Sequence, residues 1–236
     1  MTERRTTLAR RSFLSKAGAG AAALGAAIGA GSSRAQAQSA SPEGARWQPA
    51  RHAEDDWLDR VPGKHRLFFD TVTPDGLGQA IFFSNNYFTG NKNGYGLDAS
   101  DLALVICVRH HSTAFAFTDA MWAKYGKPLA ERAEFTDPKT KQPPTANVYL
   151  ASGYGASLPN GGVTLDAMIK RGIHLAVCQL SARANAAMIA RQTGGKADEI
   201  YEELVAHLVP NAHMVPAGIV AVNRAQERGY AFAYTG

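Results

Sequence analysis

The sequence is poor in cysteine, and beyond its first residues it has no excess of either charge. Only two of its 236 residues are cysteines, Cys107 and Cys178, too few for a fold held together by disulfides. The formal charge of +5 comes from the first 37 residues, which hold six of the 25 basic residues and one of the 20 acidic ones. The remainder carries 19 of each, so it has no net positive field with which to bind nucleic acid.

Motifs for phosphate and metal binding are also missing. The turn after the first expected strand reads Thr73-Pro74-Asp75-Gly76-Leu77-Gly78. It is not the GxGxxG loop that lets a dinucleotide phosphate approach the backbone, which disfavours a Rossmann enzyme. The sequence contains no HxH, HExxH or CxxC pattern. We therefore expect neither a metal site nor a cofactor.

The first 37 residues have the organisation of an export signal. Arg10 and Arg11 open the run Arg10-Arg11-Ser12-Phe13-Leu14, an uncharged stretch rich in Ala and Gly spans 17–33, and Ala35-Gln36-Ala37 is a small-residue cleavage site. This pattern resembles the twin-arginine (Tat) signal of bacteria, which predicts a periplasmic protein starting near Gln38. The alternative, a transmembrane anchor, is disfavoured because the stretch is weakly apolar and shorter than the ~20 residues of a span. No later run approaches that length, so we expect no stable membrane insertion after cleavage.

The rest of the chain alternates strand and helix patterns. Residues 38–63 are polar and read as an arm that docks through Trp47 and Trp57, and 64–236 read as one domain. Expected strands cover 65–72, 101–109, 173–178, 213–215 and 230–234, and expected helices cover 77–88, 113–125, 165–171, 181–192, 198–207 and 216–228. Residues 127–162 hold five prolines and no sustained period, which indicates a long loop or insertion. The order predicts a three-layer α/β/α sandwich with a mostly parallel sheet of about five strands.

Two segments of the expected domain carry a family resemblance. Gly172-Ile173-His174-Leu175-Ala176-Val177-Cys178, followed by Val215-Pro216-Ala217-Gly218-Ile219 and Arg224-Ala225-Gln226-Glu227-Arg228-Gly229-Tyr230, resembles the DsrE/DsrF-like family of sulfur-relay proteins. The resemblance covers roughly 65–110 and 164–235. It implies an α/β sandwich, assembly into trimers or hexamers, and in active members a cysteine that carries a persulfide, matched here by Cys178. The chain departs from the best-known, cytoplasmic members in its export signal and its insertion.

The two cysteines differ in their expected chemistry. Cys178 ends a strand just before a helix, and in open parallel sheets ligands bind at that edge. The positive end of a helix favours the thiolate that sulfur transfer needs, although a thiol buried among apolar groups is inert. Cys107 lies deeper in a more apolar run and reads as a core residue. A disulfide between them is arithmetically allowed, but cysteines in apolar strands are usually small buried hydrophobes.

Further polar residues are expected at the same edge. Arg109, His110 and His111 leave the second strand there and offer a cation, a base or a metal ligand. Adjacent histidines on an extended segment point to opposite sides, so we expect one at most to face a given pocket. Asn85 on the first helix is a further candidate to line the crevice, although polar residues on helices are more often simply solvated.

These patterns leave two hypotheses of different classes. In the first, a periplasmic DsrE-like protein binds or relays a small sulfur or thiol species through Cys178, with Arg109, His110 and Asn85 as ligand-binding residues. In the second, the chain is a non-catalytic binding or assembly module that keeps the fold without sulfur chemistry. Exposure of the Cys178 sulfur separates them, because a reactive thiol needs access to solvent.

Overall fold

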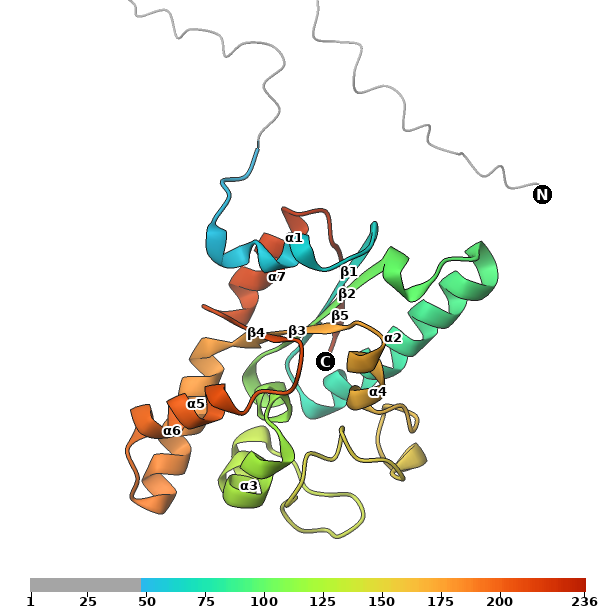
Figure 1. Ribbon diagram of the computed structural model, residues 1–236. Coiled ribbons are helices and arrows are strands. Elements are labelled where there is room, and N and C mark those ends of the chain that lie inside the picture. The colour runs from blue at the N-terminus through green and yellow to red at the C-terminus, as the bar shows by residue number, and fades with distance from the viewer. Residues whose placement is uncertain (1–47) are drawn as a thin grey trace, which may run out of the picture. The chain divides into compact units, whose positions relative to one another are not determined.

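A single parallel sheet organises the protein. The structure, a computed structural model, describes residues 48–236, which form one compact unit. The strands are β1 (His65–Thr71), β2 (Leu102–Val108), β3 (His174–Cys178), β4 (Ala212–Val215) and β5 (Ala231–Thr235). They are all parallel and lie in the order β4-β3-β2-β1-β5 (Figure 1). The predicted three-layer α/β/α sandwich is therefore confirmed.

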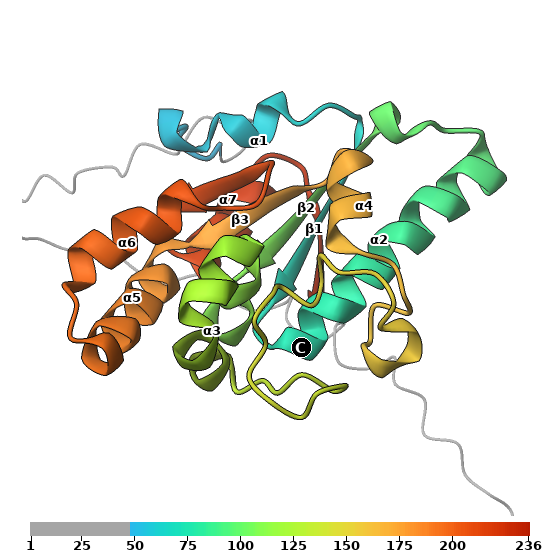
Figure 2. The ribbon, with the colours of Figure 1, turned by 60° about the horizontal axis from the view of Figure 1, so that its bottom comes forward.

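Helices cover both faces of this sheet. They are α1 (Trp57–Arg60), α2 (Pro74–Tyr95), α3 (Asp119–Ala133), α4 (Leu165–Lys170), α5 (Gln179–Thr193), α6 (Ala197–Ala206) and α7 (Gly218–Gln226). Figures 1 and 2 show α1 and α7 on one face, here called the α7 face, and the other helices on the opposite face, here called the α2 face. None of the helices in 48–236 has both the length and the apolar character that crossing a membrane requires.

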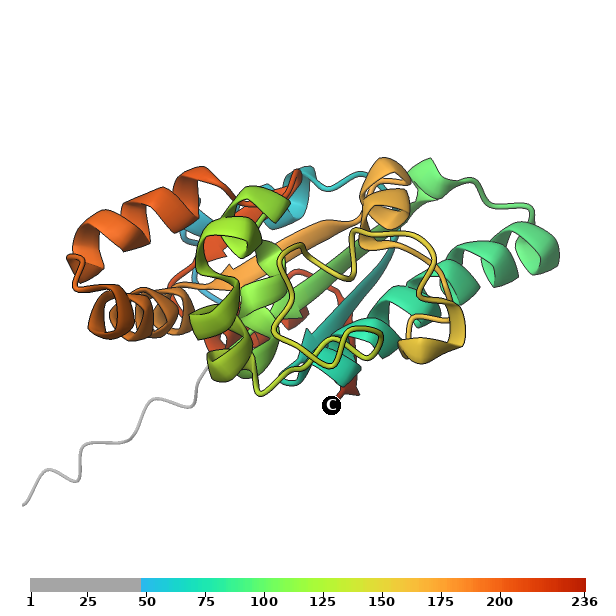
Figure 3. The same ribbon diagram turned by 90° about the horizontal axis from the view of Figure 1, so that it is seen from below.

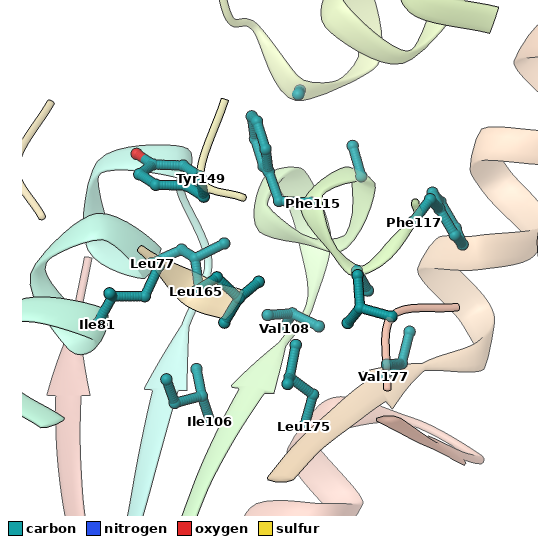
Figure 4. Close-up of a cluster of buried hydrophobic side chains, with 14 of the residues drawn as sticks. Leu77, Ile81, Ile106, Val108, Phe115, Phe117, Tyr149, Leu165, Leu175 and Val177 are labelled. Atoms are coloured by element: carbon teal, nitrogen blue, oxygen red, sulfur yellow. The ribbon is translucent and has the colours of Figure 1, made fainter. Parts of the chain in front are cut away.

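Strand β2 is the centre of the core. All seven of its residues are buried, as expected for a parallel strand covered on both sides. Leu104, Ile106 and Val108 join the larger apolar cluster on the α2 face, whereas Val105 and Cys107 join a smaller one under α1 and α7. Figure 4 shows part of the larger cluster, in which Leu77 and Ile81 of α2 lie over Ile106. Alternate residues of β2 thus pack the two halves of the core.

The helix after β1 begins where local chemistry allows it. Thr73 is its N-cap, and the Thr73 hydroxyl accepts a hydrogen bond of 2.9 Å from the backbone N–H of Gly76. Pro74 occupies the first turn, where backbone N–H groups have no partner within the helix, so the N–H that proline lacks costs no helical hydrogen bond. The helix runs to Tyr95 and ends at Gly96, whose φ of 69° is the left-handed conformation that glycine adopts most readily. It is longer than the predicted 77–88 because the polar end of the helix lacks a periodic signal.

The region after β2 differs from the prediction. Residues His110–Ala116 form a 3-10 helix, and α3 begins only at Asp119 and continues through Pro128 to Ala133. The helix predicted over 113–125 is therefore present, but its predicted bounds were wrong at both ends. A proline inside a helix clashes with the carbonyl four residues earlier, and here Tyr125 takes non-helical angles (φ −126°, ψ 21°) that open the turn.

The long loop begins later than predicted, at residue 134, and it is fixed to the core. Asn147 is fully buried, and its Nδ2 donates to the carbonyls of Phe115 (2.8 Å) and Phe117 (2.9 Å). A Cβ on Gly126 would lie 2.1 Å from the Pro144 carbonyl oxygen, so only glycine allows this approach of the loop to α3. The Tyr149 hydroxyl donates to the carbonyl of Pro74 at 2.7 Å. Figure 3 shows the loop lying across the α2 face.

Residues 48–63 pack on the α7 face. Trp57 of α1 is buried and stacks on His213 of β4, with ring centroids 4.1 Å apart and planes at 10°. His213 Nε2 in turn lies 3.0 Å from His174 Nδ1. Burial, reinforced by His174, lowers the pKa of His213 to about 4, so this ring stays neutral at pH 7. Trp47, the other docking aromatic predicted, lies outside the described residues, as does the predicted export signal.

Candidate functional site

The carboxyl ends of the strands bring the two cysteines to one face. Asp70 of β1 is the register partner of Cys107 in β2, and Cys107 is the partner of Ala176 in β3. Cys178 comes two residues after Ala176 in the same strand. Its side chain therefore points to the same side of the sheet, toward α7. Arg109 follows Cys107 by the same interval. Two thiols, one carboxylate and one guanidinium thus share the end of the α7 face.

Cys178 sits at the junction of β3 and α5. It is the last residue of the strand and occupies the N-cap position of the helix, which begins at Gln179, two residues before the start of the predicted helix over 181–192. The strand passes into the helix without a loop, so the positive end of the α5 dipole lies at the cysteine. The cysteine is free and 5% exposed. Leu180, two residues on, is 65% exposed, so the first turn of α5 reaches solvent.

Cys107 is the buried core cysteine that the sequence predicts. It has no exposed surface, and its Sγ lies 3.7 Å from the carbonyl oxygen of Gly218, at the start of α7. Burial, and secondarily the negative charge of Asp70, raises the pKa of the Cys107 thiol well above its usual value. The thiol is therefore protonated at neutral pH and is a poor nucleophile.

Arg109 is held by a carboxylate that sequence reasoning missed. Its Nε and Nη2 donate to Oδ1 and Oδ2 of Asp70 at 2.8 and 2.9 Å, a bidentate pair. Asp70 is 2% exposed and the Arg109 side chain 27% exposed. A Cβ on Gly218 would lie 2.7 Å from the Arg109 Cβ, so glycine is needed where α7 crosses this pair. Within the described chain Nη1 of Arg109 makes no hydrogen bond, which leaves one edge of the guanidinium for a ligand.

The two histidines after β2 do not diverge as predicted. They begin a 3-10 helix, and their rings stack with centroids 3.9 Å apart. His110 has a φ of 58°, and its backbone N–H donates to the Ser181 hydroxyl of α5 at 2.9 Å. Burial, followed by the neighbouring His111, lowers the pKa of His110, so the ring is neutral at pH 7. The turn, which extended-strand geometry did not anticipate, puts both rings on one side.

Asn85 lies away from the cysteines. Its Oδ1 accepts a hydrogen bond of 2.8 Å from Nη1 of Arg171. Arg171 precedes β3 by three residues and so belongs to the amino end of the sheet, opposite the edge where Cys178 lies. Asn85 therefore does not join Cys178, Arg109 and His110 in one site.

A cavity of about 370 Å³ opens near the same sheet edge. Its lining residues come from the start of α2, the turn after β2, the end of α3 and the end of β5: Thr73, Pro74, Asp75, His111, Ala133, Glu134, Phe135 and Gly236. His111 Nδ1 lies 3.8 Å from Glu134 Oε1 across it. Neither cysteine lines the cavity, so it is not a chamber for the thiols.

No group of three or more His, Cys, Asp or Glu side chains within 48–236 is placed to hold a metal ion. Sequence spacing could have pointed to Asp70, since a single acid inside the apolar run Leu67–Thr71 marks a buried charge that needs a partner.

No family model and no curated protein matches the chain.

Proposed function

We propose that the chain is an exported DsrE-like protein that binds or relays a small sulfur species through Cys178. One observation carries this proposal: Cys178 ends a parallel strand and occupies the N-cap position of the following helix, and it keeps 5% exposure where Cys107 has none. Ligands of open parallel sheets bind at this edge, and a helix N-terminus favours negative charge there.

The proposed chemistry is nucleophilic and needs no cofactor. The Cys178 thiolate attacks the terminal sulfur of an inorganic polysulfide. A bond forms between the two sulfurs, the adjacent sulfur–sulfur bond breaks, and its electron pair leaves with the shortened polysulfide. Cys178 then carries one extra sulfur as a persulfide anion. Nη1 of Arg109 and the neutral ring of His110 are the polar groups proposed to face the ligand.

The family resemblance extends the proposal to assembly and location. It implies a homo-oligomer, a trimer or hexamer, and the twin-arginine pattern of residues 1–37 supports a periplasmic location. The equal numbers of acidic and basic residues after the leader support a small-molecule or protein partner rather than a nucleic acid.

Polysulfide treatment tests the proposal. We expect the native protein to gain the mass of one or more sulfur atoms on the peptide that contains Cys178, and to lose it on reduction. Cys178→Ser should gain nothing, and Cys107→Ala should react like the wild type because Cys107 is protonated and buried. Peptide mass spectrometry under native conditions is the measurement. An unmodified Cys178, or an equal adduct in Cys178→Ser, would contradict the proposal.

The burial of both thiols favours a second candidate function. A non-catalytic binding or assembly module keeps the fold, and in it Cys178 is a core residue like Cys107. The bidentate use of Arg109 by Asp70 supports this alternative, because the pair is then a structural element rather than a ligand site. This alternative predicts that Cys178→Ala changes the free energy of unfolding but leaves every activity of the protein unchanged.

A further inference from the structure

Strands β4 and β5 form the two edges of the sheet, and within 48–236 no backbone hydrogen bond uses the outer side of either. Strand β5 bonds to β1 on its inner side, and no hydrogen bond within 48–236 uses its outer side. Edge strands expose rows of free N–H and C=O groups, which natural proteins usually protect with charge, proline or a covering segment. β5 reads Ala231-Phe232-Ala233-Tyr234-Thr235, with no charge and no proline. The strand therefore carries neither the charge nor the proline that would hinder pairing with another strand.

The same strand leaves two aromatic side chains uncovered. Phe232 is 44% exposed and Tyr234 is 55% exposed. Their side chains point to the same side of the sheet as those of their register partners Phe68 and Asp70, which is the α7 face. Parallel sheets are normally covered on both faces, so two large side chains left open beside an unpaired edge indicate a missing neighbour.

We propose that β5 pairs antiparallel with β5 of a second copy of this chain, around a two-fold axis at Ala233. In this register Ala233 meets Ala233 of the copy, and Phe232 of each chain lies directly opposite Tyr234 of the other. Two aromatic cross-strand pairs form on one face of a continuous ten-stranded sheet, and Ala231 lies opposite Thr235.

The strand itself identifies the partner. Its centre is alanine and its two aromatic residues stand at equal distances on either side of it, so the strand is complementary to its own reverse. It carries no charge, so two copies do not repel each other on close approach. A strand of a different protein would need aromatic side chains at the same two positions opposite Phe232 and Tyr234, whereas a second copy of β5 has them already. The interface does not involve Cys178, so it stands or falls independently of sulfur chemistry.

Sedimentation of the purified full chain, with charged variants, tests the interface. We expect the wild type to contain dimers or even-numbered assemblies, so of the two assemblies that the family resemblance implies this interface fits the hexamer and not the trimer. Tyr234→Lys and Phe232→Lys should lose this contact, halving the mass of a dimer. Tyr95→Lys is the matched control, because Tyr95 is an aromatic residue that is 79% exposed on α2, away from the edge. Thermal melting monitored by circular dichroism verifies that each variant is folded.

Cysteine cross-linking tests the register without disturbing the aromatic pairs. Opposite residues in an antiparallel pair have Cα atoms roughly 4.5 to 5.5 Å apart, within the range of a disulfide. Ala233→Cys should therefore cross-link to itself under mild oxidation, and Ala231→Cys should not, because Thr235 of the copy lies opposite it. A monomeric wild type, an oligomer unchanged by both lysine variants, or equal cross-linking at 231 and 233 would overturn the proposal.

Discussion

Replacing Arg109 with methionine is expected to lower the free energy of unfolding by about 3 kcal/mol. The substitution leaves the carboxylate of Asp70, which is 2% exposed, without the two hydrogen bonds that now satisfy it. An uncompensated buried charge costs far more than the net contribution of the pair itself. Chemical denaturation at pH 7 measures the loss.

The double variant Arg109→Met with Asp70→Leu is the control for this prediction. It removes both charges and leaves apolar side chains beside Cys107, so most of the lost stability should return. If single and double variants lose equal stability, the loss comes from packing and not from the orphaned carboxylate. A single variant as stable as the wild type would show that the bidentate pair is not a structural element.

The second large effect is expected at Asn147. Asn147→Ala should lower the free energy of unfolding by about 3 kcal/mol, because it leaves the Phe115 and Phe117 carbonyls without their donor in a fully buried site. The Tyr149 N–H also loses its acceptor, the Asn147 Oδ1 at 3.1 Å. Chemical denaturation again measures the change.

Local proteolysis tells how the loss at Asn147 arises. Because Asn147 fixes the loop after residue 133 to the turn after β2, its variant should be cut in that loop before the rest of the chain unfolds. Asn93→Ala, at an exposed position of α2, is the matched control and should leave both stability and cleavage unchanged. Equal behaviour of the two variants would refute this role of Asn147.

The fold followed from local patterns that do not depend on distant residues. The unbroken apolar run at β2 predicted a strand buried on both faces, and the alternation of strands and helices predicted the parallel sheet. The predicted start of the 165–171 helix was also correct, because Thr164 is the N-cap of α4 and its hydroxyl accepts from the Ala167 N–H at 3.1 Å. Such signals lie within a few residues of the element that they define.

The errors arose where tertiary contacts decide. The prediction ended the helix at 125 and began a loop at 127, but packing of α3 keeps the helix running through Pro128, past a local kink at Tyr125. His110 and His111 were treated as extended residues, whereas the turn that stacks them is fixed by the bond to Ser181, 71 positions away. Asp70 could have been noticed as a lone acid in an apolar run, but its partner Arg109 could not be identified because it follows a different strand, 39 positions away. Sequence spacing carries no direct information about these long-range contacts.

Native-state thiol labelling tests the proposed role of Cys178 most directly. With a small uncharged alkylating reagent the account predicts that one cysteine of the folded protein reacts, that the labelled peptide contains Cys178, and that Cys107 reacts only after unfolding. Labelling of Cys178 that appears only together with that of Cys107, on denaturation, would contradict it and leave the sulfur atom as part of the core.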